Sequence, residues 1–237
     1  MLRLVVANPN ATDAITDACV MLARAAASPG TEIVGWTNRG GPPVVDSWYG
    51  DYAAGRPLAR GLRTLTPTPD GVVLAGFGNY GTLAVKEALD MPVVALAEAA
   101  MATAVPLCRR FAIVTTAPRM VAYTEDLVAM LGFRDRCAAV TAVSLPPLDV
   151  PIDDAAVVDE IAAAIAGIPA AAGVDLIILG GARLAPYAVA LRTRTPLVVL
   201  EPVACAVQMV ESLIRLGLCQ SKTGAFAPPP QPFEAYE

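Results

Sequence analysis

The sequence predicts an α/β fold made of two similar halves, each with a central parallel sheet covered by helices on both faces. Short runs rich in β-branched residues alternate with helical, alanine-rich stretches along all 237 residues. Several of these runs are apolar throughout instead of alternating, which is typical of parallel strands buried on both faces. The length allows one or two domains with a large core. We therefore expect two pseudo-symmetric three-layer domains, with a cleft between them.

Eight runs have the composition of strands. In chain order they cover residues 2–7, 32–37, 71–75, 92–96, 110–115, 139–143, 175–179 and 196–200. Eight stretches have the spacing of helices. They cover residues 11–27, 57–65, 82–89, 98–107, 121–131, 155–172, 185–191 and 201–216. We expect residues 39–57 to form a long irregular loop whose aromatic residues either belong to a lid or a subunit contact or pack onto their own half. The proline-rich tail, residues 225–237, is expected to be an extended arm.

An internal repeat divides the chain. Residues 71–76 and 175–180 each form an apolar strand that ends in glycine, and in both halves a proline follows that glycine by 16 residues. We expect residues 1–107, with a C-terminal segment of approximately 205–237, to form one half and residues 108–204 the other. Such a repeat places equivalent strand-end loops face to face, so the natural ligand site is the cleft between the halves.

Composition excludes several classes of partner. The chain has 17 basic and 22 acidic residues, a net charge of −5, and no basic stripe, so we expect neither nucleic acid nor an anionic membrane as partner. Mean hydropathy is high at +0.54, yet no apolar run approaches the roughly 20 residues that span a bilayer. The N-terminus enters a strand directly and resembles no signal peptide, so a cytoplasmic protein is expected. The apolar composition and the aromatic loop favour a homo-oligomer, either a dimer or a tetramer.

The chain contains no histidine, which excludes Ser-His-Asp and Cys-His catalysis and histidine-ligated metals. Its five cysteines show no metal-binding spacing and are expected to pack as small apolar side chains. Residues 76–81 superficially fit a dinucleotide glycine motif, but that motif would follow the first strand, which ends here in Asn8-Pro9-Asn10. We therefore expect no metal, nucleotide or flavin cofactor.

Three strand-end segments carry polar or glycine residues suited to a ligand. Asn10 opens the first helix, where it is placed either to cap the helix or to cap it and bind a carboxylate. The glycines of residues 76–81 allow close approach of the backbone to a ligand. Arg183 stands in the equivalent turn of the second half, either bound to a substrate carboxylate or solvated.

Taken together, segments in order along almost the whole chain resemble the aspartate/glutamate/hydantoin racemase superfamily, and within it the hydantoin racemase branch. The matching segments are Asn8-Pro9-Asn10, Gly41-Pro42-Pro43, Phe77-Gly78-Asn79-Tyr80-Gly81, Ala97-Glu98-Ala99-Ala100, Thr115-Thr116 with Arg119, Leu179-Gly180-Gly181-Ala182, Pro202-Val203, and Leu216-Gly217 with Ser221-Lys222. The resemblance implies two pseudo-symmetric α/β domains, an active site in the cleft between them and a small-molecule substrate.

The resemblance also implies a mechanism from which this sequence departs. The family uses two cysteines, one per half, on opposite faces of the substrate Cα; one thiolate removes the proton and the other thiol returns it. Gly76 stands at the first of these positions and Gly181 at the second. The family often has Asp-Pro where this chain has Asn79-Tyr80, and glycine where it has Arg183. Glycine can neither donate nor accept a proton, so racemisation cannot proceed here in the family's manner. The two glycines are also expected to open space for a larger substrate or an activated water.

Three hypotheses of function follow. The first is an enzyme with altered chemistry (hydrolase, lyase or decarboxylase) acting on a small cyclic amide, an amino-acid derivative or a carboxylate in an anion-stabilising cleft. The second is a cysteine-independent isomerase, and the third a non-catalytic ligand-binding protein. The candidate acid–base residues are Tyr80, Glu98, Glu201 and Lys222. The candidate substrate-binding residues are Asn10, Gly76, Phe77, Asn79, Tyr80, Thr116, Gly181, Ala182 and Arg183.

Overall fold

The computed structural model describes residues 1–145 and 154–236. Its strands are β1 (Leu2–Asn8), β2 (Thr31–Thr37), β3 (Gly71–Leu74), β4 (Val93–Ala95), β5 (Phe111–Thr116), β6 (Cys137–Val143), β7 (Leu176–Gly180) and β8 (Val198–Leu200). Its α-helices are α1 (Asp13–Ala26), α2 (Trp48–Arg63), α3 (Thr82–Ala88), α4 (Leu96–Ala104), α5 (Met120–Met130), α6 (Ala155–Ala166), α7 (Ala188–Leu191) and α8 (Pro202–Arg215). Short 3₁₀ helices are η1 (Ala170–Ala172), η2 (Ala185–Tyr187) and η3 (Phe233–Tyr236).

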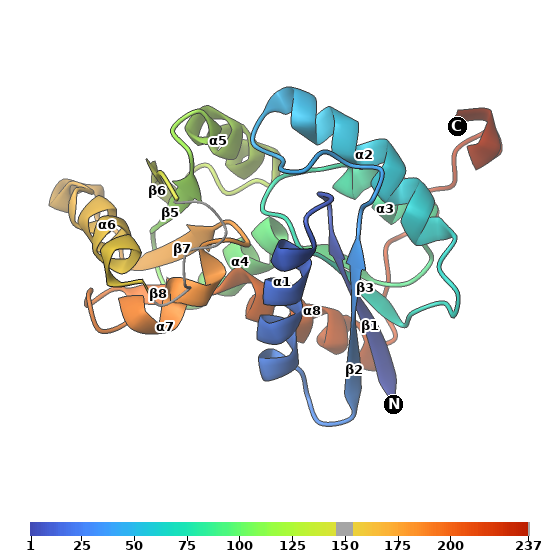
Figure 1. Ribbon diagram of the computed structural model, residues 1–237, viewed down its shortest axis with the longest axis horizontal. Helices are drawn as coiled ribbons and strands as arrows, with labels where there is room; N and C mark the ends of the chain where they lie inside the picture. Colours follow the sequence, from blue (N-terminus) through green and yellow to red (C-terminus); the bar gives the residue numbers. More distant parts are fainter. Residues whose placement is uncertain (146–153, 237) are drawn as a thin grey trace.

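The strands form two four-stranded parallel sheets of the same topology, which confirms the predicted fold class. The first sheet has the order β2-β1-β3-β4 and the second β6-β5-β7-β8. Each sheet therefore begins with a central strand, adds its second strand on one side and its remaining two on the other. The carboxyl ends of β1, β3, β5 and β7 carry the loops that build the site described below (Figure 1).

Each sheet lies between two layers of helices because alternate residues of its strands point to opposite faces. In the first sheet, Val5 and Leu74 face α2 and α3, whereas Leu4 and Val73 face α1 and α8. The second sheet is layered in the same way, with α6 and α7 on one face and α4 and α5 on the other. This arrangement explains why the strands lack an apolar–polar alternation.

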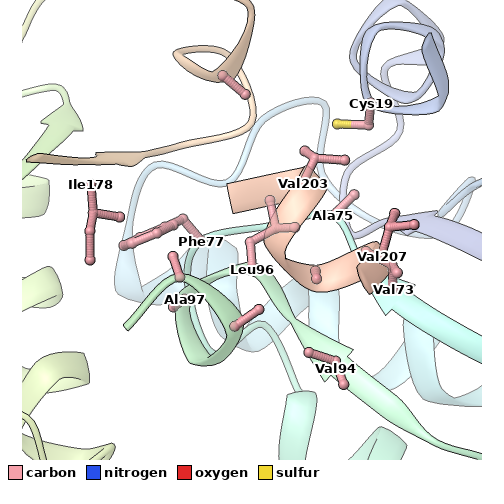
Figure 2. Close-up of a cluster of buried hydrophobic side chains, with 14 of the residues drawn as sticks. Cys19, Val73, Ala75, Phe77, Val94, Leu96, Ala97, Ile178, Val203 and Val207 are labelled. Carbon is pink, nitrogen blue, oxygen red and sulfur yellow. The ribbon is translucent and has the colours of Figure 1, made fainter. Parts of the chain in front are cut away.

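One hydrophobic core joins the two sheets. It contains residues of β1 and β3 together with residues of β5 and β7, and α4 and α8 lie between the sheets (Figure 1). Phe77, from the loop after β3, lies between Ile178 of β7 and Ala97 of α4 (Figure 2). Helix α8 also returns to pack on β3, β4, α1 and α4. These contacts support our proposal that residues from about 205 onward belong with the first half.

The segment expected to be an irregular loop, residues 39–57, is helical from Trp48 onward, so this expectation is wrong. Ser47 caps α2 through its Oγ, which accepts the N–H of Gly50 at 3.1 Å. Pro57, which suggested a helix start, lies inside α2 instead. The cap signal at Ser47 was present in the sequence. The exposed aromatic residues Trp48 and Tyr49 consequently stand on the first turn of a helix.

The tail after residue 224 lies beside α2 without forming a long helix. Arg63 of α2 forms an ion pair with Glu234 at 2.9 Å and lies 4.9 Å from the ring centroid of Phe233. The tail ends in the short 3₁₀ helix η3, so it is an arm that is extended only in part; Glu237 falls outside the described residues. Within the described ranges, no helix is long and apolar enough to cross a membrane.

Glu211 on α8 is fully buried and ties this helix to the turn between α1 and β2. Its carboxylate accepts the N–H of Ser28 at 2.9 Å, the Oγ1–H of Thr31 at 2.6 Å and a guanidinium N–H of Arg215 at 2.7 Å. Burial alone raises the pKa of Glu211, but these hydrogen bonds and the Arg215 charge outweigh it and lower the pKa. Because the pKa of Glu211 is lower in the folded chain than in the unfolded chain, its ionised carboxylate stabilises the fold at pH values above the unfolded pKa. This stabilisation is lost as pH falls through the folded pKa.

We expect Glu211→Gln to lower the free energy of unfolding by about 2 kcal/mol at pH 7, because donors that face a carboxylate would meet a neutral amide. The difference should shrink as pH falls below about 4.3, the ordinary pKa of an unfolded glutamate, because the unfolded wild-type chain then takes up a proton that the folded chain does not. Urea unfolding at pH 7 and pH 3.5 measures both values. Glu125→Gln, at an exposed position of α5, is the matched control. An equal loss at both pH values would contradict the electrostatic role.

Candidate active site

A small cavity lies where the strand-end loops of the two sheets meet. It has a volume of about 70 Å³ and is lined from both halves. The first half contributes Pro9, Asn10, Ile15, Val44, Val45, Ala75, Gly76, Phe77, Gly78 and Tyr80. The second contributes Thr115, Thr116, Met120, Tyr123, Thr124, Gly180, Gly181, Ala182 and Arg183. All the predicted substrate-binding residues except Asn79 therefore line one cavity, and their roles there remain proposals.

The aromatic ring of Tyr80 fills the space beside Gly76 and Gly78. A Cβ atom added to Gly76 would lie 2.4 Å from Cδ2 of Tyr80, and one added to Gly78 would lie 2.3 Å from Cε1 of the same ring. Neither position accepts a side chain while the ring lies there. The expectation that glycine at position 76 opens space is therefore wrong, because Tyr80 occupies that space. At Gly181 an added Cβ would make only an ordinary contact, 3.4 Å from Cγ2 of Thr116.

The backbone of Tyr80 is in an uncommon conformation. Its φ is 38°, and Ala117, which follows β5, has φ 65°. These are the non-glycine residues with positive φ in the described part of the chain, and both belong to strand-end loops around the cavity. Such strained residues persist only where the surroundings hold them, and they concentrate at functional sites. The strained backbone at Tyr80 thus accompanies the placement of its ring over Gly76 and Gly78.

Tyr123 of α5 joins the two halves at the cavity. Its hydroxyl accepts the backbone N–H of Asn79 at 2.7 Å and donates its proton to Oδ2 of Asp51, also at 2.7 Å. The ring of Trp48 lies 4.6 Å from the ring of Tyr123, and the ring of Tyr80 is stacked at 6.3 Å. Helix α2 thereby reaches across to α5 (Figure 1). The hydroxyl proton of Tyr123 is committed to Asp51 and is not offered to a ligand.

Burial fixes the protonation of these groups. It raises the pKa of Tyr80, and nearby Asp51 raises it further. Burial likewise raises the pKa of Tyr123, and it raises the pKa of Asp51 despite the hydrogen bond from Tyr123. Both tyrosines are therefore neutral phenols near pH 7, and the Tyr80 hydroxyl keeps a proton to donate.

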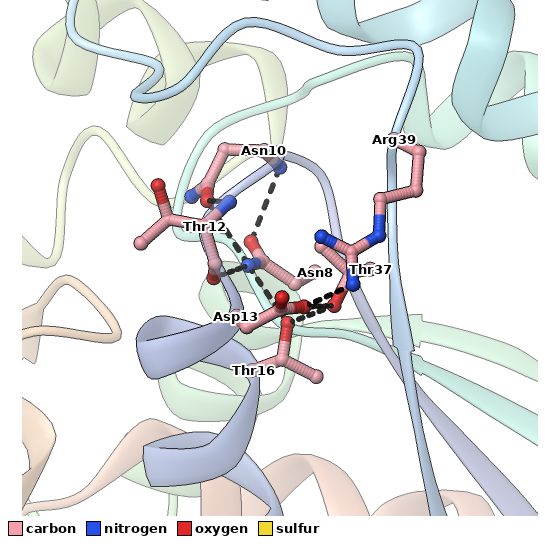
Figure 3. A network of polar contacts seen from close by, with 7 residues as sticks. All are labelled: Asn8, Asn10, Thr12, Asp13, Thr16, Thr37 and Arg39. Atoms are coloured by element: carbon pink, nitrogen blue, oxygen red, sulfur yellow. Dashed lines mark hydrogen bonds and ion pairs between the residues drawn. The ribbon is translucent and has the colours of Figure 1, made fainter.

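Asn10 is positioned by a polar network at the end of β1 (Figure 3). Asn8 is fully buried, and its amide donates at 3.0 Å to Oδ1 of Asn10 and to Oγ1 of Thr16. Oδ1 of Asn10 also accepts the N–H of Thr12. The N-cap residue of α1 is Thr12, so the expectation that Asn10 caps this helix is wrong. Asn10 therefore braces the turn that precedes the helix. Because its oxygen is occupied, the amide N–H₂ is the group that Asn10 presents toward the cavity.

Arg183 gives the cavity its charge. Burial lowers the pKa of its guanidinium, and an electrostatic interaction with Tyr187 opposes that shift. A guanidinium stays protonated in proteins all the same. The ionisable residues of the lining are Tyr80, Tyr123 and Arg183, so with neutral phenols the lining carries a single positive charge. Such a cavity favours an anionic ligand over a neutral or cationic one.

Three of the four candidate acid–base residues do not line the cavity and instead hold helix ends. Glu98 accepts the N–H of Ala95 at 3.1 Å at the start of α4 and forms an ion pair with Lys86. Glu201 caps α8 by accepting the N–H groups of the second and third residues after it, at 2.6 and 2.8 Å. Lys222 donates to two carbonyls at the end of α3, at 2.8 and 2.9 Å. Among the four, Tyr80 alone reaches the cavity.

None of the five cysteines lines the cavity. Cys19 and Cys137 illustrate their role, since burial raises their pKa to about 12 and about 11, so neither thiol ionises near pH 7. Within residues 1–145 and 154–236, no cluster of three His, Cys, Asp or Glu side chains is placed to hold a metal ion.

Sequence reasoning missed Tyr123 and Asp51. Tyr123 stands on the first turn of the helix after β5, and parallel strands place such turns at the ligand edge of a sheet. This rule would have indicated Tyr123 once the helix was predicted. No local signal identifies Asp51, because it meets Tyr123 across 72 residues of chain.

Known proteins resemble this chain in sequence and in fold. Residues 4–210 match the model of the Asp/Glu/hydantoin racemase family. A hydantoin racemase of Paenarthrobacter aurescens is 30% identical over 230 residues, which is 96% of this chain and 98% of that protein. The structure of allantoin racemase from Pseudomonas fluorescens is similar with a TM-score of 0.92 and 35% identity, covering 98% of both chains. Allantoin racemase from Klebsiella pneumoniae has a TM-score of 0.88, also at 35% identity, over 98% of this chain and 95% of that one.

We expect Gly76→Ala to lower the free energy of unfolding by about 1–3 kcal/mol, because the added methyl group collides with the Tyr80 ring. In a chain that also carries Tyr80→Ala, the same glycine substitution should cost less, because the ring contacts at 2.4 and 2.5 Å are gone and the contact with Cγ of Pro9 at 2.8 Å remains. Urea unfolding of the four proteins of this double-mutant cycle measures the coupling. Gly181→Ala, where the cavity has room, is the control and should have little effect. Additive effects of the Gly76 and Tyr80 substitutions would contradict the described packing.

Proposed function

Because the chain belongs to the Asp/Glu/hydantoin racemase family, on its hydantoin racemase-like branch, we propose that it is an enzyme that decarboxylates a small carboxylate in the cleft. The observation that carries this proposal is the cavity lining, which holds one positive charge, one proton-donating phenol, and neither thiol nor carboxylate. Racemisation by proton transfer needs two groups on opposite faces of a carbon atom. Decarboxylation needs an anion site and a single proton donor.

In the proposed reaction, the substrate carries its carboxylate on a carbon that is also bonded to a carbonyl group. The bond from this carbon to the carboxylate breaks, its electron pair stays on the carbon, and carbon dioxide leaves. Arg183 stabilises the carbonyl oxygen that gains negative charge. The carbon then takes the proton of the Tyr80 hydroxyl, and the resulting phenolate recovers a proton from water. Each substrate molecule therefore consumes one proton.

The names of the relatives narrow the substrate class. Hydantoin racemases and allantoin racemases are the similar proteins, so a carboxylated cyclic ureide is the first compound to test. Hydrolysis is supported less well, because the lining offers no carboxylate to activate water. An isomerase is also supported less well, because the Tyr123 proton is already donated to Asp51.

A non-catalytic ligand-binding protein is the second candidate. The supporting observation is the cavity lining, which offers no thiol and no carboxylate to remove a proton from a bound ligand. This candidate predicts a thermal shift with carboxylates or ureides and no turnover of any of them.

A homo-oligomer remains part of the proposal. Tyr49 and Tyr52 on α2 are 82% and 84% exposed, and aromatic side chains of this kind are enriched at subunit interfaces. Light scattering at micromolar concentration should give a mass at least twice the 24.5 kDa of the single chain. A monomeric mass would contradict it.

With 5-methylhydantoin-5-carboxylate as the probe, we expect release of carbon dioxide. Tyr80→Phe should lower kcat by about 10²-fold or more while the ligand-induced thermal shift remains, because the ring stays and the proton donor is lost. Arg183→Gln should lower kcat/KM by about 10–100-fold, because the charged hydrogen bond to the oxygen that gains negative charge is lost. Treatment with iodoacetamide should leave activity intact. Turnover that survives in Tyr80→Phe, or that iodoacetamide abolishes, would overturn the proposal.

A further inference from the structure

The loop that carries Tyr80 is held by two side chains from helices, Asp51 of α2 and Tyr123 of α5. Tyr123 accepts the N–H of Asn79, the residue before Tyr80, at 2.7 Å, and the Tyr80 backbone lowers the pKa of Asp51. Asp51 and Tyr123 are themselves joined at 2.7 Å. The backbone N–H next to the strained residue Tyr80 is thus bound by a phenol whose own proton is donated to a carboxylate.

We propose that Asp51 is a positioning residue that, together with Tyr123, holds the strained loop so that the Tyr80 ring lies over Gly76 and Gly78. The role of Tyr80 in turnover rests on the function proposed above, whereas the positioning itself does not. The backbone of Tyr80 has a strained φ of 38°. Such a conformation relaxes unless surrounding contacts hold it, so the loop needs residues that do so.

The ionised form of Asp51 is the form that holds the loop, because a carboxylate accepts hydrogen bonds more strongly than a carboxylic acid. The ionisable residues that act on it are Tyr123 from α5 and Tyr80 from the loop after β3, and Asp46, from the segment before α2, acts on Tyr80. Burial raises the pKa of Asp51. As the pH falls, this residue therefore protonates before an ordinary aspartate does, and the hold on the loop weakens at that point.

Trp48 provides a reporter that needs no ligand. Its ring lies 4.6 Å from that of Tyr123, and the sequence contains just one other tryptophan, Trp36. In a Trp36→Phe background, the emission of Trp48 is recorded from pH 4 to pH 8. The same background is then combined with Asp51→Asn, with Tyr123→Phe, and with Asp46→Asn as the matched control that removes a neighbouring carboxylate.

We expect the background protein and the Asp46→Asn control to show one transition with a midpoint above about pH 4, the ordinary value for aspartate. Asp51→Asn should abolish it, whereas Tyr123→Phe keeps the titrating carboxylate and should move the midpoint to higher pH, because the hydrogen bond that lowers the pKa of Asp51 is lost. Hydrogen exchange at pH 7 should be at least about tenfold faster in the peptide covering residues 76–82 of both variants, with far-UV circular dichroism unchanged.

A transition that persists in Asp51→Asn, or exchange in residues 76–82 that neither variant changes, would overturn the assignment. Because these measurements use no substrate, they stand even if the protein decarboxylates nothing. If Tyr80→Phe loses turnover while the pH profile of its Trp48 emission is unchanged, the catalytic role of Tyr80 is distinct from the positioning of the loop.

Discussion

The packing of Phe77 against the second sheet is the contact on which the site depends. Phe77, in the loop after β3, lies against Ile178 of β7 and belongs to the core that both sheets share (Figure 2). Gly180, at the end of β7, has no room for a side chain beside Ile113, and its Cβ would lie 3.4 Å from the Phe77 ring. The two strand-end loops are therefore fixed against each other by apolar packing. This packing also sets the positions of the polar groups at the tips of the loops, which need not hold the two halves together.

Within this frame, the glycines and Tyr80 form one steric unit. A side chain at Gly76 or Gly78 would collide with the Tyr80 ring. The ring lies there because Tyr123 and Asp51 hold the loop backbone, in which Tyr80 has a positive φ. A change at any of these positions alters the others. The position that the family resemblance assigns to a thiol is thus occupied by a phenol brought from four residues further along the chain. A weak acid of high pKa replaces a group that ionises readily, which supports proton donation over proton abstraction.

The sequence predicted the eight strands closely because each is a short apolar run buried on both faces. It predicted the cavity loops because equivalent strand ends of two parallel sheets must meet. It misplaced the start of α2, since Pro57 resembles a first-turn proline while the cap is Ser47. It overestimated Glu98 and Glu201, because an acidic residue at a helix start is as suited to capping as to catalysis. The bond between Asp51 and Tyr123 depends on how two halves pack, and no local pattern encodes it.

The central claim is that this cleft donates one proton and does not exchange protons on both faces of a carbon. Incubation of enantiopure 5-methylhydantoin with the protein in D₂O tests this most directly, with loss of the C5 hydrogen followed by NMR and optical rotation followed in parallel. We predict that both signals change no faster than without protein, because the cavity lining contains no thiol and no carboxylate to remove the C5 proton. Rapid exchange accompanied by racemisation would contradict the account and would place a two-base mechanism in this cleft.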